Sequence, residues 1–271
     1  MTENTDISVY LSGEKLYGDD FNFEQIQQWF NEEKEGYAEL GAKDMSTYSY
    51  PYHEQNIYLG YCDLKKDKKL RILSIGGAYG DELLPIADFA SSITILEPSD
   101  QLRRESLNGK KINYFTPSID GRMPFEDNSF DVITCFGVMH HIPNVSFVLM
   151  EASRVLANGG TFFLREPIVS MGDWSKKRGN LTKNERGIPL KLFISAIDNA
   201  GFQIKKRSLC NAKPFDIIFS KIFAKQPYNS KWYVRIDYLL SLIFSFKASN
   251  YHSRGIWDKI RPVAVFFQLT K

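Results

Sequence analysis

Short apolar runs rich in β-branched residues recur along the chain, separated by polar turns and helix-like patterns. The runs that predict strands are RILSI at 71–75, ITIL at 93–96, INYF at 112–115, FDVITC at 130–135, TFFLR at 161–165, QIKKRS at 203–208 and VAVFFQL at 263–269. Strands that alternate with helices usually form a parallel sheet with helices on its faces. The pattern therefore predicts an α/β core.

Two segments flank this core. Residues 23–40 place apolar side chains at a helical spacing on an acidic background, which predicts a helical cap. Residues 211–260 are rich in aromatic, aliphatic and lysine residues and are interrupted by Pro214 and Pro227, so we expect an insert of two or more helices. The predicted organisation is an N-terminal cap at 1–69, a core at 70–210, a helical insert at 211–260 and a last core strand at 261–271.

A glycine-rich turn, GGAYG at 76–80, follows the first predicted strand and precedes a helix that starts near Asp81. Glycine lets the backbone adopt positive φ and approach a ligand closely, and a helix start presents free N–H groups. Gly76 and Gly80 are therefore the best candidate cofactor contacts. A dinucleotide fingerprint would require glycine where Ala78 and Asp81 stand, which weakens a nicotinamide interpretation. The alternative is a tight connection with no ligand.

Polar residues follow the next buried strands. Glu97 ends the second strand about 20 residues after the first glycine, where an acid can accept hydrogen bonds from ribose hydroxyls. A solvated acid at the end of a strand is the alternative. The strand predicted at 130–135 is followed by Phe136, Met139, His140 and His141. Ligands of open α/β sheets bind beyond such carboxyl ends.

The runs MPFEDNSFD at 123–131 and VMHHIPN at 138–144 are similar to those of class I S-adenosylmethionine-dependent methyltransferases, in the subgroup with L-P-F-x-D-x-S-F-D followed by V-x-H-H. The glycine turn, Glu97 and these runs occur in the family's order over roughly residues 70–170. The resemblance implies a Rossmann-like doubly wound sheet of seven strands, the last antiparallel, with S-adenosylmethionine across the carboxyl ends.

Positions carried over from this resemblance define a candidate cofactor site. It comprises Ser74, Gly76, Gly77, Ala78, Gly80, Glu97, Asp120 and Phe136. The resemblance implies that the glycine turn lies against the methionine part, Glu97 against the ribose, Asp120 near the adenine and Phe136 beside the sulfonium. The family usually has an acid at Ser74 and a glycine at Ala78, so the contact to the methionine amino group is expected to differ. The loop after Asp120 is one residue shorter than usual, which makes Ile119 an alternative adenine contact.

Methyl transfer from a sulfonium requires an aligned acceptor and the exclusion of water, and a hydroxyl acceptor also benefits from a general base. His140 and His141 are candidates for that base, although one of the pair is expected to hold the loop structurally. We expect no metal. His53, in the aromatic segment before the core, is a candidate for closing over the acceptor, and a surface position is its alternative.

The segment at 165–189 is long and polar for a connection after a strand, and such loops often carry recognition. Its charged side chains include Arg165, Glu166, Asp173, Arg178, Glu185 and Arg186. Arg165, Glu166, Arg178 and Arg186 are candidate acceptor contacts together with His53, with solvated charge as the alternative.

The charged loop and the late insert are similar to methyltransferases encoded with bacterial surface-polysaccharide enzymes. This weaker resemblance implies O-methylation of a saccharide or related cell-surface precursor. Carbon or nitrogen methylation of a lipid, quinone-like or amine acceptor is the alternative within enzymes. A module that binds cofactor or partner without catalysis is the alternative from another class.

Composition narrows the setting further. The first ten residues lack the pattern of a secretory signal, and the apolar run at 238–246 is too short to span a membrane, so we expect a cytoplasmic protein. Cys62, Cys135 and Cys210 have no metal-type or redox-type spacing, which predicts reduced thiols without zinc.

Charge is unevenly distributed along the chain. Residues 1–70 carry 7 basic and 14 acidic side chains, whereas residues 205–261 carry 12 basic and 3 acidic ones. We expect no nucleic-acid partner, because no recognised binding motif accompanies the basic stretch. The insert could instead lie on the anionic inner face of a membrane, but an apolar face buried against the protein is favoured.

Overall fold

The computed structural model describes residues 7–65, 69–174, 176, 178–179, 181–223, 225–253 and 255–271. The parts of the predicted cap at residues 1–6 and 66–68, and residues 175, 177 and 180 of the polar segment, lie outside the described residues.

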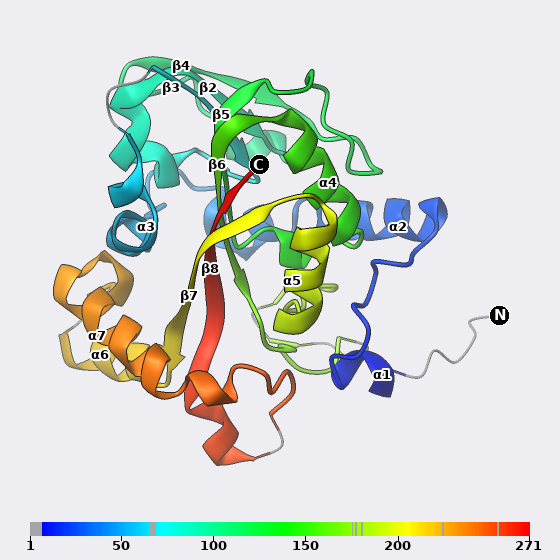
Figure 1. Ribbon diagram of the computed structural model, residues 1–271, viewed down its shortest axis with the longest axis vertical. Helices are drawn as coiled ribbons and strands as arrows, with labels where there is room; N and C mark the ends of the chain where they lie inside the picture. The colour runs from blue at the N-terminus through cyan, green and yellow to red at the C-terminus, as the bar shows by residue number, and fades with distance from the viewer. Residues whose placement is uncertain are drawn as a thin grey trace.

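One mixed sheet organises the chain (Figure 1). Its strand order is β3-β4-β2-β1-β5-β6-β8-β7. The strands are β1 Leu70–Ile75, β2 Ala90–Leu96, β3 Ser106–Leu107, β4 Lys110–Phe115, β5 Phe130–Phe136, β6 Leu156–Pro167, β7 Gln203–Lys213 and β8 Arg261–Thr270. Strands β4, β2, β1, β5 and β6 run parallel, and β8 is antiparallel to both of its neighbours. The predicted Rossmann-like sheet with an antiparallel last strand is confirmed; the eighth strand, β3, is too short to produce a sequence pattern.

Helices cover both faces of the sheet. The α-helices are α1 Ser8–Leu11, α2 Phe23–Glu33, α3 His53–Leu59, α4 Val145–Val155, α5 Leu190–Asn199, α6 Phe215–Phe223 and α7 Lys231–Ile243. The shorter elements are η1 Ala38–Ala42, η2 Tyr61–Asp63, η3 Asp81–Phe89, η4 Asp100–Leu102, η5 Met139–His141, η6 Pro227–Asn229, η7 Ser245–Lys247 and η8 Ile256–Lys259. Figure 1 shows α4 and α5 on one side of the sheet and α3, α6 and α7 on the other.

Two apolar cores result from this arrangement. One buries Leu149 of α4 and Phe193 of α5 with Phe267 of β8. The other buries Leu59 of α3 with Phe266 of β8. Successive side chains of a strand point to opposite faces of a sheet, so neighbouring phenylalanines of β8 serve different cores. The sheet is thus covered on both faces, and its functional surface must lie at the strand ends.

Two predicted helices differ from expectation. The helix after the glycine turn is the 3₁₀ element η3, with Pro85 inside it. Proline lacks the N–H that an α-helical hydrogen bond needs, which favours the tighter form. The helix predicted at 23–40 ends at Glu33, and η1, a π-helical turn, follows it. Asn22 and Gln25 form a reciprocal capping box that defines the start of α2.

The insert was expected to bury its apolar face against the protein, and α7 does so only in part. Its buried side chains are Tyr233, Val234, Asp237 and Ser241, whereas Trp232, Ile236 and Leu239 are exposed. The carboxylate of Asp237 accepts the N–H groups of Asn211 (2.9 Å) and Ala212 (2.7 Å), which explains why this acid faces inward. Within the described chain, no helix has the length and apolar character needed to cross a membrane.

Candidate functional site

The glycine turn at 76–80 leaves β1 in a left-handed conformation. Gly76 has φ +63°, and its N–H donates to the carbonyl of Leu96 at the end of β2 (2.8 Å). A Cβ atom on Gly76 would lie 2.5 Å from Cγ1 of Val138, and one on Gly77 would lie 2.1 Å from Oγ of Ser74. Both positions therefore require glycine, and the turn keeps its backbone close to the ends of the neighbouring strands.

Glu97 is held at the end of β2 by backbone N–H groups. Its Oε2 accepts from Ala78 of the glycine turn (3.0 Å) and its Oε1 from Ser99 (3.1 Å). Burial raises the pKa of Glu97 to about 7, although both hydrogen bonds oppose the shift. The carboxylate thus fixes the turn against β2 while each oxygen retains a further lone pair.

A second buried acid lies beneath the same turn. The hydroxyl of Ser74 donates a short hydrogen bond to Glu82, on the first turn of η3. Burial raises the pKa of Glu82 to about 7 against the opposing effect of that hydrogen bond. Glu82 was missed by the sequence analysis. In the sequence, Glu82 is an acid near the start of the helix after the turn, which is a common position for an acid. Only the three-dimensional fold brings its carboxylate under Gly77.

An apolar cavity opens beside Gly76 at the carboxyl ends of the parallel strands. Its lining is Trp29, Phe30, Glu33, Lys34, Ile75, Gly76, Leu96, Pro98, Pro117, Ser118, Ile119, Gly121, Met123, Val138, His141, Ile142, Pro143, Asn144 and Val148. Helix α2 closes it, because Nε1 of Trp29 donates to the carbonyl of His141 (2.7 Å). Ile119 lines the cavity, whereas Asp120 lies outside the lining and pairs with Arg122.

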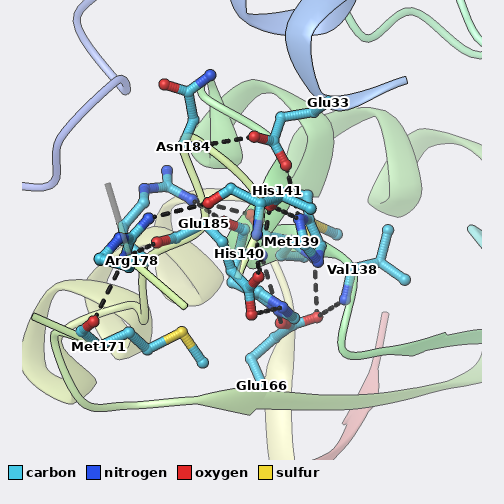
Figure 2. A network of polar contacts seen from close by, with 12 residues as sticks. Glu33, Val138, Met139, His140, His141, Glu166, Met171, Arg178, Asn184 and Glu185 are labelled. Carbon is cyan, nitrogen blue, oxygen red and sulfur yellow. Dashed lines mark hydrogen bonds and ion pairs between the residues drawn. The ribbon is translucent and has the colours of Figure 1, made fainter. Parts of the chain in front are cut away.

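His140 and His141 occupy opposite electrostatic settings (Figure 2). Nδ1 of His140 lies 2.7 Å from Glu166, and its Nε2 lies 3.6 Å from Glu185. Burial alone would lower the pKa of His140, but the hydrogen bonds and charges of these two carboxylates raise it to about 9. His140 is therefore a buried imidazolium at neutral pH.

His141 is neutral by the same argument. Its Nδ1 lies 2.9 Å from Oε2 of Glu33 and 3.2 Å from the hydroxyl of Thr182. Burial and the charge of His140, whose ring centroid is 4.1 Å away, lower the pKa of His141 despite the nearby carboxylates. Of the two histidines, it is His141 that lines the cavity beside Gly76.

The loop carrying the histidines is held from beneath by Glu166. Its carboxylate accepts the N–H groups of Val138 (2.8 Å), Met139 (2.9 Å) and His140 (3.3 Å). The acceptor contact of Glu166 stays a prediction, and its side chain is fully buried beneath this loop. The physical reason is that a buried carboxylate needs several donors, and this loop provides them.

Two arginines predicted to contact the acceptor also bind the protein's own backbone. Arg186 is 0% exposed. It donates to the carbonyl oxygens of Tyr17, Met139, His140, Ile142 and Pro143. Arg178 donates to those of Met171, Thr182, Lys183 and Glu185. Both arginines thus hold the polar loop together, and their roles as acceptor contacts stay predictions.

Arg165 and His53 lie with α3 rather than with the histidine loop. The guanidinium of Arg165 is 3.8 Å from the ring centroid of Tyr52 and 5.3 Å from that of Phe136. It donates to Asn56 (3.0 Å) and Gln55 (3.1 Å). Nε2 of His53 lies 2.8 Å from the carbonyl oxygen of Asp81. The predicted acceptor residues therefore fall into two separate groups.

His140, His141 and Glu185 each bring one possible ligand atom to within 4.8 Å of the others. This set could coordinate a metal ion, which the sequence analysis did not expect. Hydrogen bonds to Glu166 and Glu33 already occupy Nδ1 of both rings.

Comparisons with known proteins show what the core of this chain is similar to. Residues 73–164 match the family model described as Methyltransferase domain. The chain is 29% identical over 119 residues to sterol 4-C-methyltransferase strm-1 of Caenorhabditis elegans, covering 42% of this chain and 35% of that protein. It is 25% identical over 219 residues to glycine/sarcosine/dimethylglycine N-methyltransferase of Actinopolyspora halophila, covering 76% of this chain and 37% of that protein.

A solved S-adenosylmethionine-dependent methyltransferase from Mesorhizobium loti is similar in fold, with a TM-score of 0.52 at 14% identity over 78% of this chain and 95% of that one. The chain spans about a third of the length of the two curated relatives, at 35% and 37%. The predicted resemblance of the core to methyltransferase domains is confirmed for residues 73–164, and the fold is similar to that of a solved S-adenosylmethionine-dependent methyltransferase. The resemblance to polysaccharide-cluster enzymes stays a prediction.

The raised pKa of His140 makes stability depend on pH. Because its folded pKa of about 9 exceeds the ordinary 6.5, the stabilisation is fully present below about pH 6.5 and is lost as pH rises through about 9. We expect the wild type to have a larger free energy of unfolding than His140→Gln. The difference should be greatest near pH 6.5 and should shrink as the pH rises toward about 9. Urea unfolding across this range measures the effect. His252→Gln, which removes an exposed histidine, is the control; a difference for His140→Gln that is constant with pH would contradict the assignment.

Proposed function

We propose that this chain, whose residues 73–164 form a methyltransferase domain, transfers a methyl group from S-adenosylmethionine to a small acceptor. The observation that carries the proposal is the glycine turn at 76–80, tied to β2 by Glu97 and open to an apolar cavity at the carboxyl ends of the strands. Open α/β sheets bind ligands at that edge. S-adenosylmethionine would supply an electrophilic methyl group on a positively charged sulfur.

The residues present fit this cofactor. Backbone of Gly76, Gly77, Ala78 and Gly80 would border its methionine part, since side chains at the first two positions would fill the space. The free lone pairs of Glu97 suit ribose hydroxyls. Ile119 and Met123 provide an apolar wall for the adenine, which favours Ile119 over the side chain of Asp120. Phe136, at the end of β5, stays the candidate beside the sulfonium.

Glu82 would replace the acid that the family usually has at Ser74. Its carboxylate lies under Gly77 and receives the Ser74 hydroxyl, so serine at 74 positions the acid instead of supplying it. A methionine ammonium group is a suitable partner for a carboxylate in this buried setting. The departure at Ser74 therefore gives no support to an inactive binding module.

His141 is the better candidate for a general base. A base must be unprotonated at working pH, and the lowered pKa of His141 meets this requirement whereas the raised pKa of His140 does not. Glu33 orients the His141 ring through Nδ1. His140 would act as a positioning residue whose charge keeps its neighbour neutral.

The acceptor we propose is an oxygen of a saccharide or related precursor. Tyr52 presents an aromatic ring that stacks on Tyr228 (centroids 5.2 Å apart) and carries Arg165 on it, a combination of ring faces and donors that suits polyhydroxylated molecules. The apolar cavity around His141 favours the second candidate, carbon or nitrogen methylation of a lipid, quinone-like or amine acceptor.

Transfer of labelled methyl groups discriminates between these acceptors. We expect nucleotide sugars or glycan precursors to accept the label and quinone analogues not to. Label on the quinone analogues alone would replace the first candidate by the second. If the protein bound the cofactor but transferred no label to sugars, quinone analogues, amines or lipids, it would instead be a binding module without catalysis.

Calorimetric titration tests the cofactor site. We expect micromolar binding of S-adenosylmethionine and S-adenosylhomocysteine and none of NAD, and about tenfold or greater weakening in Glu97→Ala because a ribose partner is lost. Glu126→Ala, at an exposed acid, is the matched control. Equal affinities for wild type and Glu97→Ala, with both folded by circular dichroism, would contradict the ribose assignment.

The role of Glu82 gives a distinct pH signature. A carboxylate that pairs with an ammonium group must be ionised, so wild-type affinity should rise as pH increases through about 7. Glu82→Gln should weaken cofactor binding about tenfold or more and reduce this rise, whereas Ser74→Ala should have the smaller effect. Titrations of all three proteins over this range measure it. If the affinity of Glu82→Gln for the cofactor still rose through about pH 7, the rise would come from another group. Glu97, whose pKa is also about 7, would then be the candidate.

A further inference from the structure

Helix α7 carries large apolar side chains on its exposed face. Its inward face buries Tyr233 and Val234 together with Asp237 and Ser241, and its outward face also exposes apolar side chains. These are Trp232, Ile236, Leu239, Leu242 and Ile243. A helix facing only water normally places its polar side chains outward. The outward face of α7 is therefore suited to contact with something apolar.

The neighbouring elements extend the same surface. Helix α6 buries Asp216 and Phe219 and exposes Ile217, Ile218, Ile222 and Phe223, and Phe246 and Trp257 are exposed farther along the chain. We call these six apolar residues, together with the five of α7, the insert face. The rings of Phe223 and Trp232 lie 5.5 Å apart and join the exposed sides of α6 and α7. Exposed apolar side chains grouped in this way mark an interaction site.

The exposed charges of the insert share one sign. Among its described residues, the exposed charged side chains are Lys221, Lys225, Lys231, Arg235 and Lys259. Its acids are turned away from solvent or partly so: Asp216 is buried and paired with Lys213, Asp237 is buried and bonded to backbone N–H groups, and Asp258 is half-buried and accepts the N–H of Gly255. The insert thus combines apolar side chains with exposed positive charge.

We propose that the insert face docks on the surface of an anionic lipid bilayer. Aliphatic and aromatic side chains would enter the boundary between headgroups and acyl chains, while the basic side chains would contact the headgroups. A second copy of the chain is a poorer occupant, because a two-fold interface would place the same basic side chains opposite each other. The net positive charge therefore favours lipid over self-association.

The position of the insert relates this surface to the candidate site. Figure 1 shows α6 and α7 side by side at the periphery, below α3 and away from α2. Tyr228 of η6 stacks on Tyr52, whose ring carries the guanidinium of Arg165. An acceptor carried on a lipid would therefore reach the protein from the side of the proposed acceptor residues. The docking itself does not rest on the proposed methyl transfer, and its test measures binding only.

Tryptophan fluorescence can report directly on the insert face. Trp232 and Trp257 are 49% and 75% exposed, whereas Trp29 and Trp174 are 2% and 7% exposed. Vesicles of phosphatidylcholine with a third of phosphatidylglycerol should shift the emission to shorter wavelength and protect it from acrylamide quenching. The same vesicles should co-sediment the protein, and binding should weaken as salt screens the basic side chains.

Variants separate the contribution of the basic side chains from that of the apolar side chains. Lys231→Ala should weaken partitioning about fivefold, as expected for one basic side chain near an anionic surface, and Trp232→Ser with Leu239→Ser should abolish the spectral shift. Lys111→Ala and Met150→Ser are the matched controls, since both replace exposed residues outside the insert. Circular dichroism establishes that each variant is folded.

Two results would overturn the proposal. One is equal sedimentation with anionic vesicles and with phosphatidylcholine alone, without a change in emission. The other is a dimer in analytical ultracentrifugation that Trp232→Ser and Leu239→Ser dissociate, which would make a second copy the occupant. Neither measurement includes cofactor or methyl acceptor, so both results are independent of whether the protein transfers methyl groups.

Discussion

The carboxylate of Glu166 accepts three consecutive backbone N–H groups after β5 and also contacts the ring of His140. An uncompensated carboxylate in this position would be strongly unfavourable, so the loop is obliged to turn its N–H groups toward it. Much of the site depends on this constraint. It places Val138 against Gly76, where only a glycine fits, and it leaves His141 facing the cavity.

Acids of the same chemical type take different states because their surroundings differ. Glu97 and Glu82 are surrounded mainly by apolar atoms and neutral donors, and burial raises the pKa of each to about 7. Burial would also raise the pKa of Glu185, but the hydrogen bond and charge of His140 outweigh it and lower the pKa to about 2. Separate environments thus give one group of acids suited to a cofactor and another that fixes the histidines.

The insert shows how a local requirement can shape a whole surface. Asp237 must face inward because the N–H groups of Asn211 and Ala212 at the end of β7 bond to it. A helix that turns such an acid inward presents its opposite side to the surroundings, and in α7 that side carries Trp232 and Leu239. The inward acid and the exposed apolar side chains of the helix are therefore two aspects of one arrangement.

Local patterns in the sequence determined the strands, the glycine turn and the order of the core, because alternation, β-branched runs and glycine positions depend on near neighbours along the chain. The runs at 123–131 and 138–144 indicated the family for the same reason. Tertiary structure alone decided that Glu82 lies under Gly77, that Arg186 bonds the carbonyl groups of Tyr17 and of the loop that ends at Pro143, and that α7 leaves Trp232 and Leu239 exposed. Each of these depends on which groups meet across long separations in the chain and on whether burial leaves a charge with a partner, and neither is encoded in the spacing of residues.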